Sequence, residues 1–168
     1  LMMSDATQSV GKMKIDLDEL NIIRKLSSKN KVLFLDCGSN YGFYSFYTAS
    51  LRVDNKIIAI EASKETSSEF IKNQNLNNFS NISFNNKSIS DSDDHNVLFN
   101  ESEKDWESSQ THNDFNLKKT SSVKSIKIDT LVENLQLSKF KIIIKLDIEG
   151  NEMRAIQGGL ELINKTSP

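Results

Sequence analysis

Short runs of apolar residues, separated by stretches with helical character, are the feature that most limits how this chain can fold. The runs lie at residues 32–35 (VLFL), 56–60 (KIIAI), 82–84 (ISF) and 141–147 (KIIIKLD). A continuous apolar run of this length is typical of a parallel strand that is buried on both faces. Strands that alternate with helices indicate a parallel sheet covered by helices, which is an α/β fold.

Two capping-box patterns indicate where helices begin. Asp16 with Glu19 predicts the start of a helix over residues 15–26, whose apolar residues form one stripe. Thr66 with Glu69 predicts the start of a second helix that reaches about residue 77. Further helices are expected at residues 43–51, 131–137 and 152–163.

A polar insert at about residues 90–121 interrupts this alternation. Residues 97–99 and 123–128 alternate enough to form strands beside it, and we expect them to pair as a hairpin. A polar connection of this length is usually either a functional loop or a disordered one. Three side chains within it could serve a substrate or simply belong to a surface loop: His95, Trp106 and His112.

Length and charge exclude several classes of protein. The 168 residues suit one domain, expected over residues 15–168 after a flexible lead-in at residues 1–14. The net charge of -2 is spread along the chain, which argues against a nucleic-acid or anionic-membrane partner. The apolar runs are far shorter than the roughly 20 residues that span a bilayer. Cys37 is the only cysteine, so we expect a buried core thiol and a cytoplasmic protein.

Three acidic residues follow apolar runs, and they should meet at one edge of the predicted sheet. Asp36, Glu61 and Asp147 each lie at or just past the end of such a run. In a doubly wound fold, ligands bind at the carboxyl ends of the strands. These carboxylates therefore predict a binding site, although Asp36 and Glu61 could also merely cap helices or end strands.

The loop LDCGSNYG at residues 35–42 indicates which ligand fits this site. Gly38 and Gly42 permit a tight turn and close approach of the backbone to a ligand. Their spacing differs from the G-x-G-x-x-G pattern of dinucleotide sites, and Asp36 would repel a pyrophosphate, which disfavours an NAD-dependent oxidoreductase. A ligand with ammonium and sulfonium charges suits the carboxylate better. S-adenosylmethionine meets this description, and Glu61 could accept hydrogen bonds from its ribose hydroxyls.

Five segments of the chain resemble, in order and spacing, the FkbM family of S-adenosylmethionine-dependent methyltransferases. They read DCGSNYG, IIAIEAS, NQNLNNFSNISF, IKIDTL and IIIKLDIEGNEMRAIQGG, and the resemblance covers about residues 31–165. It implies a Rossmann-like class I methyltransferase fold with helices on both faces of a parallel sheet. It also implies methyl transfer, commonly to a hydroxyl of a sugar or other small molecule.

The resemblance also implies roles for individual residues. The glycine loop would hold the methionine end of the cofactor, Glu61 the ribose, and Ser88 with Ile89 the adenine. The full set of expected cofactor contacts is Asp36, Gly38, Ser39, Asn40, Gly42, Glu61, Ala62, Ser88 and Ile89. Asp147, Glu149 and Glu152 would line the acceptor site.

The general base is expected among these three acceptor-site residues. Asp147 is the favoured candidate, because it ends a strand beside the loop and other carboxylates could raise its pKa. Glu149 is the second candidate, whereas Glu152 also fits an acidic residue in the first turn of a helix. No metal site is predicted.

One departure from the family pattern concerns the end of the chain. The family fold has about seven strands, whereas this sequence stops after the helix that follows the fourth core strand. Residues 141–147 would then form an apolar edge, which proteins normally cover. We therefore expect a domain that lacks its C-terminal strands, with a homo-oligomer or another chain as a way to complete the sheet. The alternative function is a degenerate domain that binds cofactor or partners without turnover.

Overall fold

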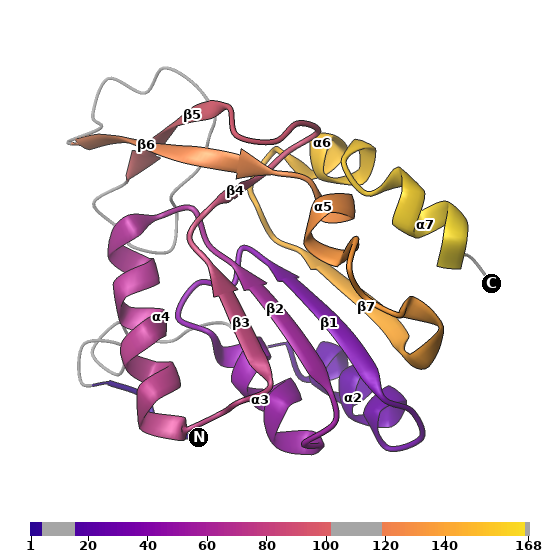
Figure 1. Cartoon of the computed structure of the whole chain (residues 1–168). Coiled ribbons are helices and arrows are strands. Elements are labelled where there is room, and N and C mark those ends of the chain that lie inside the picture. The colour runs from indigo at the N-terminus through magenta and orange to yellow at the C-terminus, as the bar shows by residue number, and fades with distance from the viewer. Residues whose placement is uncertain (5–15, 102–118, 167–168) are drawn as a thin grey trace.

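The computed structural model describes residues 1–4, 16–101 and 119–166, and its centre is a four-stranded parallel sheet (Figure 1). The strand order is β3-β2-β1-β7. Their bounds are Val32–Cys37 for β1, Lys56–Ile60 for β2, Ile82–Asn85 for β3 and Lys141–Leu146 for β7. All three pairings are parallel, so the predicted α/β fold and its four core strands are confirmed. Within the described residues β7 is an edge strand, as expected.

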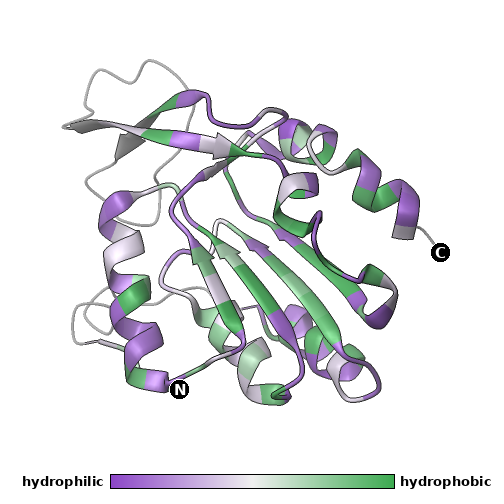
Figure 2. Cartoon of the chain, in the orientation of Figure 1, coloured by the Kyte–Doolittle hydropathy of each residue, from purple (hydrophilic) through white to green (hydrophobic). Residues whose placement is uncertain are grey.

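Helices cover both faces of this sheet. One set comprises α2 (Leu17–Ser27), α3 (Phe43–Leu51) and α4 (Lys64–Asn77), and the other comprises α5 (Ile128–Val132), α6 (Glu152–Gln157) and α7 (Leu160–Thr166). Phe34 of β1 packs in a cluster with Phe46 and Phe70 from the first set. Leu35 packs in a second cluster with Leu162 from the other set. Successive residues of a strand point to opposite faces, so an apolar run without alternation is buried on both sides. Figure 2 shows these hydrophobic strands between the helices.

A second, three-stranded sheet lies beyond the carboxyl ends of β1, β2 and β3 (Figure 1). It consists of β4 (Ser88–Ile89), β5 (Asn96–Glu101) and β6 (Lys119–Ile126). β5 and β6 pair antiparallel, which confirms the predicted hairpin, whereas β4 pairs parallel with β6. His95 is exposed beside β5, and its backbone nitrogen donates to Ser125 Oγ. Trp106 and His112 lie outside the described residues.

Asp93 connects the turn before β5 to the start of α5. Its carboxylate accepts from the backbone nitrogen of Lys127 and from Thr130 Oγ1, each at 2.8 Å. Lys127 Nζ also lies 3.6 Å from Asp93 Oδ2. The beginning of the polar insert is therefore anchored to the main domain.

The helix starts were predicted with mixed success. Asp16 is the N-cap of α2, as expected, and accepts from the backbone nitrogens of Asp18 and Glu19. The predicted start of α4 at Thr66 was wrong, because the helix begins at Lys64 and Ser63 is its N-cap. The backbone nitrogen of Thr66 donates to Ser63 Oγ at 3.2 Å.

Two predicted helices near the C-terminus also differ from the structure. The helix expected at residues 131–137 is instead α5, followed by the 3-10 turn η1 (Leu137–Lys139). The single helix expected at residues 152–163 is divided into α6 and α7 at Gly158 and Gly159. A Cβ on Gly158 would lie 2.2 Å from the carbonyl oxygen of Ser90, so the helix ends where the two backbones touch.

Most of the predicted lead-in at residues 1–14 lies outside the described residues, but its first four residues lie along α4. The Asn77 side chain bonds both the nitrogen and the carbonyl oxygen of Met2. The backbone nitrogen of Ser4 donates to Asn73 Oδ1 at 2.7 Å. No helix in the described parts of the chain is long and apolar enough to cross a membrane.

Candidate active site

The glycine loop follows β1 and is held to the end of β2. The backbone nitrogens of Gly38 and Ser39 both donate to the carbonyl oxygen of Ile60, at 3.0 and 2.9 Å. Gly38 has a φ of 76° and Gly42 a φ of 92°, which are left-handed values that favour glycine. Cys37, the last residue of β1, is buried as predicted, and burial together with the Asp36 carboxylate raises the pKa of its thiol to about 12.

The two glycines are required mainly by contacts within the protein. A Cβ on Gly38 would lie 2.0 Å from the carbonyl oxygen of Asp147. A Cβ on Gly42 would lie 2.4 Å from the ring of Phe46 and 2.7 Å from that of Phe70. The expected close approach therefore exists, but the groups that approach are backbone and aromatic rings of the chain itself.

Glu61 joins the glycine loop to the loop after β2. Its Oε2 accepts from the backbone nitrogen of Asn40 at 2.9 Å, and its Oε1 accepts from that of Ser63 at 2.8 Å. Burial raises the pKa of Glu61, and the backbone donors of Ser63 and Asn40 offset part of that rise. Asn86 Nδ2 donates to the carbonyl oxygens of both Glu61 and Ala62, which fixes the backbone at these two predicted site residues.

Asp36 lies beneath the glycine loop, on the face of the sheet that packs against α3. Ser45 Oγ donates to Asp36 Oδ2 at 2.6 Å, and Lys145 Nζ lies 3.5 Å from Oδ1. Burial raises the pKa of Asp36, while the Lys145 ammonium and the Ser45 hydroxyl offset part of that rise. This carboxylate is fully buried, which differs from the direct contact with a cofactor that the sequence led us to expect.

The three predicted acceptor-site residues follow β7, and the structure places Asp147 beside the glycine loop as expected. Its backbone nitrogen donates to the carbonyl oxygen of Cys37 at 3.1 Å, and its side chain is 71% exposed. The charged group that contacts its carboxylate is Lys145 Nζ, at 3.4 Å, rather than another carboxylate. Glu149 is exposed and has a φ of 42°.

Glu152 is occupied by its own turn. Both of its carboxylate oxygens accept from the backbone nitrogen of Gly150, at 3.1 and 3.0 Å. Glu152 is also the first residue of α6, where a negative charge is favourable. The structure therefore gives Glu152 the helix-start contacts that were its alternative interpretation.

Ser88 and Ile89 form β4, and both are buried. Ile89 packs with Ile126 and Ile128 in one of the two core clusters. Its carbonyl oxygen accepts from Asn151 Nδ2, so the turn after β7 is joined to the strand that carries these two residues.

Sequence reasoning missed Lys145, which contacts both Asp36 and Asp147. The parallel register places it opposite Asp36 in the neighbouring strand. A single lysine inside the apolar run IIIKL was the available signal, because a charged residue in a buried strand needs a partner. The identity of the partner depends on which strands are neighbours, which the residue pattern alone does not give.

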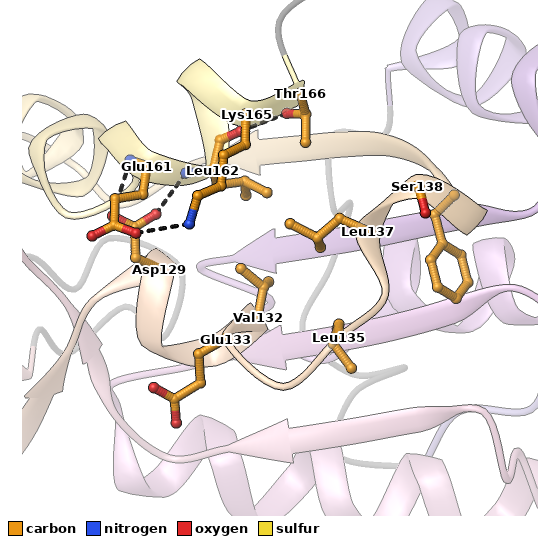
Figure 3. Close-up of a pocket in the computed structure, with 11 residues that line it drawn as sticks. Asp129, Val132, Glu133, Leu135, Leu137, Ser138, Glu161, Leu162, Lys165 and Thr166 are labelled. Atoms are coloured by element: carbon orange, nitrogen blue, oxygen red, sulfur yellow. Dashed lines mark hydrogen bonds and ion pairs between the residues drawn. The ribbon is translucent and has the colours of Figure 1, made fainter.

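A cavity of about 480 Å³ lies between α5, η1 and α7, away from the glycine loop (Figure 3). Its floor is apolar, with Val132, Leu135 and Leu162, and none of the predicted site residues lines it. Asp129 at its rim accepts from the backbone nitrogens of Glu161 and Leu162, and so stabilises the start of α7. The chemical groups suited to a nucleoside therefore lie at the edge of the sheet rather than in this cavity.

The fold and the site define a Rossmann-like α/β protein whose glycine loop is bonded to an acidic residue at the end of the next strand. The family model described as the methyltransferase FkbM domain matches residues 36–168. The chain belongs to this family, as its sequence motifs indicated. No curated protein matches the sequence.

Similar solved structures include methyltransferases at low identity. One is an S-adenosylmethionine-dependent methyltransferase from Agrobacterium tumefaciens, with 14% identity, a TM-score of 0.38, and a match over 43% of this chain and 24% of that one. Another is a precorrin-6y C5,15-methyltransferase from Geobacter metallireducens, with 16% identity, a TM-score of 0.38, and a match over 45% of this chain and 40% of that one. The match thus spans less than half the length of either protein.

Proposed function

We propose that this chain is an S-adenosylmethionine-dependent methyltransferase that methylates a hydroxyl group of a sugar or other small molecule. The observation that carries the proposal is the Glu61 carboxylate, which binds the backbone of Asn40 in the glycine loop and of Ser63 after β2. This junction lies within the part of the chain that matches the methyltransferase family model. It lies at the carboxyl edge of the sheet, where ligands of such folds bind.

The groups around the loop fit a nucleoside cofactor. The Glu61 carboxylate accepts backbone hydrogen bonds from Asn40, Ser63 and Ala62. A carboxylate has about four lone-pair sites, so a ribose hydroxyl could use the remaining one. Ser39 Oγ is buried and has no hydrogen-bond partner among the described residues. Because buried hydroxyls are normally bonded, Ser39 is available to a polar group of the cofactor.

The remaining predicted cofactor residues would act on the shape of the site. Gly38, Asn40 and Gly42 set the path of the loop through their positive φ angles. Asp36 would support the loop from beneath, since its carboxylate is buried. Ala62 would extend the ribose side, and Ser88 with Ile89 would form the wall against the adenine.

In the proposed mechanism the chain aligns the acceptor and takes up a proton. The cofactor supplies a methyl group on a sulfonium sulfur; transfer forms a C–O bond, breaks the C–S bond and frees the hydroxyl proton. Asp147 is the proposed base, because its exposed carboxylate lies next to the loop, and Glu149 is the second candidate. Alignment can lower the reaction barrier by about 7–11 kcal/mol. A general base raises the rate by about 100- to 10,000-fold, which corresponds to a smaller change in the barrier, so orientation is the larger effect. Glu152 would act by shaping the turn.

A titration tests the proposed cofactor. Calorimetry with S-adenosylhomocysteine, run beside NAD, should give saturable binding of the first compound only. Radiolabelled methyl transfer to a panel of sugars then tests the acceptor class. Failure of the folded protein to bind S-adenosylhomocysteine would overturn the proposal, whereas binding without transfer to any acceptor would favour a domain that binds without turnover.

The buried free thiol of Cys37 supports a reducing, cytoplasmic location.

A further inference from the structure

Lys145 is a charged residue in an otherwise apolar strand, and its ammonium has three polar neighbours. Nζ donates to the carbonyl oxygen of Gly38 at 3.0 Å. It also lies 3.5 Å from Asp36 Oδ1 and 3.4 Å from Asp147 Oδ2. The ring of Tyr44 covers it at 5.5 Å from the ring centroid. The side chain is 16% exposed, so these contacts replace most of the water that an ammonium needs.

The charges around Lys145 keep it protonated. Burial lowers the pKa of Lys145, but the carboxylates of Asp36 and Asp147 raise it by more, and the net direction is upward. Asp36 Oδ1 is buried without a hydrogen-bond partner among the described residues, so this ammonium is the group that compensates its charge. A buried carboxylate and a nearly buried ammonium therefore depend on each other.

The three contacts of Lys145 belong to different parts of the site. Gly38 opens the loop proposed to hold the cofactor, and Asp147 is the proposed base on the acceptor side. Asp36 is directly opposite Lys145 in the sheet register. The strand pairing therefore fixes the backbone from which the Lys145 side chain reaches Gly38 and Asp147. A displacement of the ammonium would move the loop carbonyl and release the Asp147 carboxylate together.

We propose that Lys145 is a positioning residue that couples the glycine loop to Asp147, so that cofactor affinity depends on the acceptor-side carboxylate. This inference rests on the proposed methyltransferase function. It requires that Asp147→Asn weakens cofactor binding through Lys145, although Asp147 is not a proposed cofactor contact. The same substitution has no effect on cofactor affinity once the ammonium is removed.

The test compares Lys145→Met with Lys145→Arg, which keeps a charge, and with Lys141→Met, an exposed lysine on the same strand. We expect Lys145→Met to weaken S-adenosylhomocysteine binding about tenfold, the scale of one lost charge-assisted contact. Lys145→Arg restores part of this affinity, and Lys141→Met leaves it unchanged. Because Lys145→Met leaves Asp36 uncompensated, the variant Asp36→Asn/Lys145→Met provides a background in which both buried charges are gone.

A double-mutant cycle separates coupling from simple destabilisation. Asp147→Asn should weaken binding in the wild-type background and leave it unchanged in the Asp36→Asn/Lys145→Met background. Equal effects of Asp147→Asn in the two backgrounds would overturn the inference, because Asp147 would then influence cofactor affinity without Lys145.

Hydrogen exchange of the ligand-free protein gives a readout that does not need the cofactor. The amides of Gly38, Ser39 and Asp147 should exchange faster in Asp36→Asn/Lys145→Met than in Lys141→Met. If exchange is faster in this variant but the wild-type protein binds no S-adenosylhomocysteine, the proposed function and the coupling to cofactor affinity are refuted. The structural link from Lys145 to the loop and Asp147 would still stand. Unchanged exchange would refute the link itself.

Discussion

The backbone nitrogen of Asn40 donates a 2.9 Å hydrogen bond to Oε2 of Glu61, across 21 positions of sequence. Asn40 has a φ of 50°, and its own Oδ1 accepts from the backbone nitrogen of Tyr41. The loop after β1 thus has its non-glycine residue of positive φ held at both its backbone nitrogen and its side chain. Glu61 therefore shapes the loop in addition to any contact with a ribose.

Glu61→Gln should weaken both the loop and the cofactor site. A glutamine side chain has one acceptor oxygen, so it can satisfy Asn40 or Ser63 but not both. We expect a loss of about 1–3 kcal/mol in the free energy of unfolding and roughly tenfold weaker binding of S-adenosylhomocysteine. Chemical denaturation measures the free energy of unfolding, and calorimetry measures the binding of S-adenosylhomocysteine. Glu65→Gln, at an exposed position, is the control. Wild-type affinity in Glu61→Gln would exclude Glu61 from the site.

The pH dependence of stability should reveal the burial of Glu61. Its folded-state pKa is raised above the ordinary 4.5, mainly by burial. The folded protein therefore retains a proton that the unfolded chain has lost as the pH rises above 4.5. The difference in unfolding free energy between wild type and Glu61→Gln should be largest below pH 4.5 and fall as the pH rises through the folded pKa. A difference that grows over this range would mean that Glu61 has a lowered pKa.

Gly38→Ala should destabilise the fold through two separate effects. The left-handed conformation at a φ of 76° costs about 1–2 kcal/mol for a residue with a Cβ. The new methyl group would also displace the Asp147 carbonyl, which lies 2.0 Å from the Cβ position. Urea denaturation should show a clear loss, whereas the control Ser39→Ala removes an unbonded hydroxyl and changes stability little. Equal stability of Gly38→Ala and wild type would contradict this geometry.

The core strands could be predicted because a buried parallel strand requires an apolar side chain at nearly every position. β1 and β2 meet this requirement throughout their apolar runs, and the structure has them at those positions. Helix boundaries were less predictable, since Ser63 and Thr66 are both good N-cap residues and the structure uses Ser63. The break at Gly158 depends on contact with Ser90, which lies far away in sequence.

The position of the site could be predicted from the residues at the ends of the strands, but the contacts within the site could not. The sequence predicted that Asp36, Glu61 and Asp147 would gather at one edge, and the structure brings all three around the glycine loop. It could not predict that Asp36 points beneath the loop toward Ser45. The role of Lys145 depends on the pairing of β1 with β7, which is a property of the whole sheet.

Asp129→Ala should loosen α7 without affecting the glycine loop. Its carboxylate accepts from the backbone nitrogens of Leu162 at 2.9 Å and Glu161 at 3.1 Å, as Figure 3 shows. A carboxylate at a helix N-terminus satisfies free amides and favours the helix dipole, so its loss should cost about 0.5–2 kcal/mol.

Hydrogen exchange should accelerate at the Glu161 and Leu162 amides of Asp129→Ala, and S-adenosylhomocysteine affinity should be unchanged. Glu133→Ala is the matched control, because Glu133 follows α5 closely and its carboxylate accepts from the side chain of the adjacent Asn134. Equal protection of the two α7 amides in both variants would show that packing of Leu162, rather than the carboxylate, holds the start of this helix. Weakened cofactor binding in Asp129→Ala alone would instead show that α7 and the glycine loop are coupled.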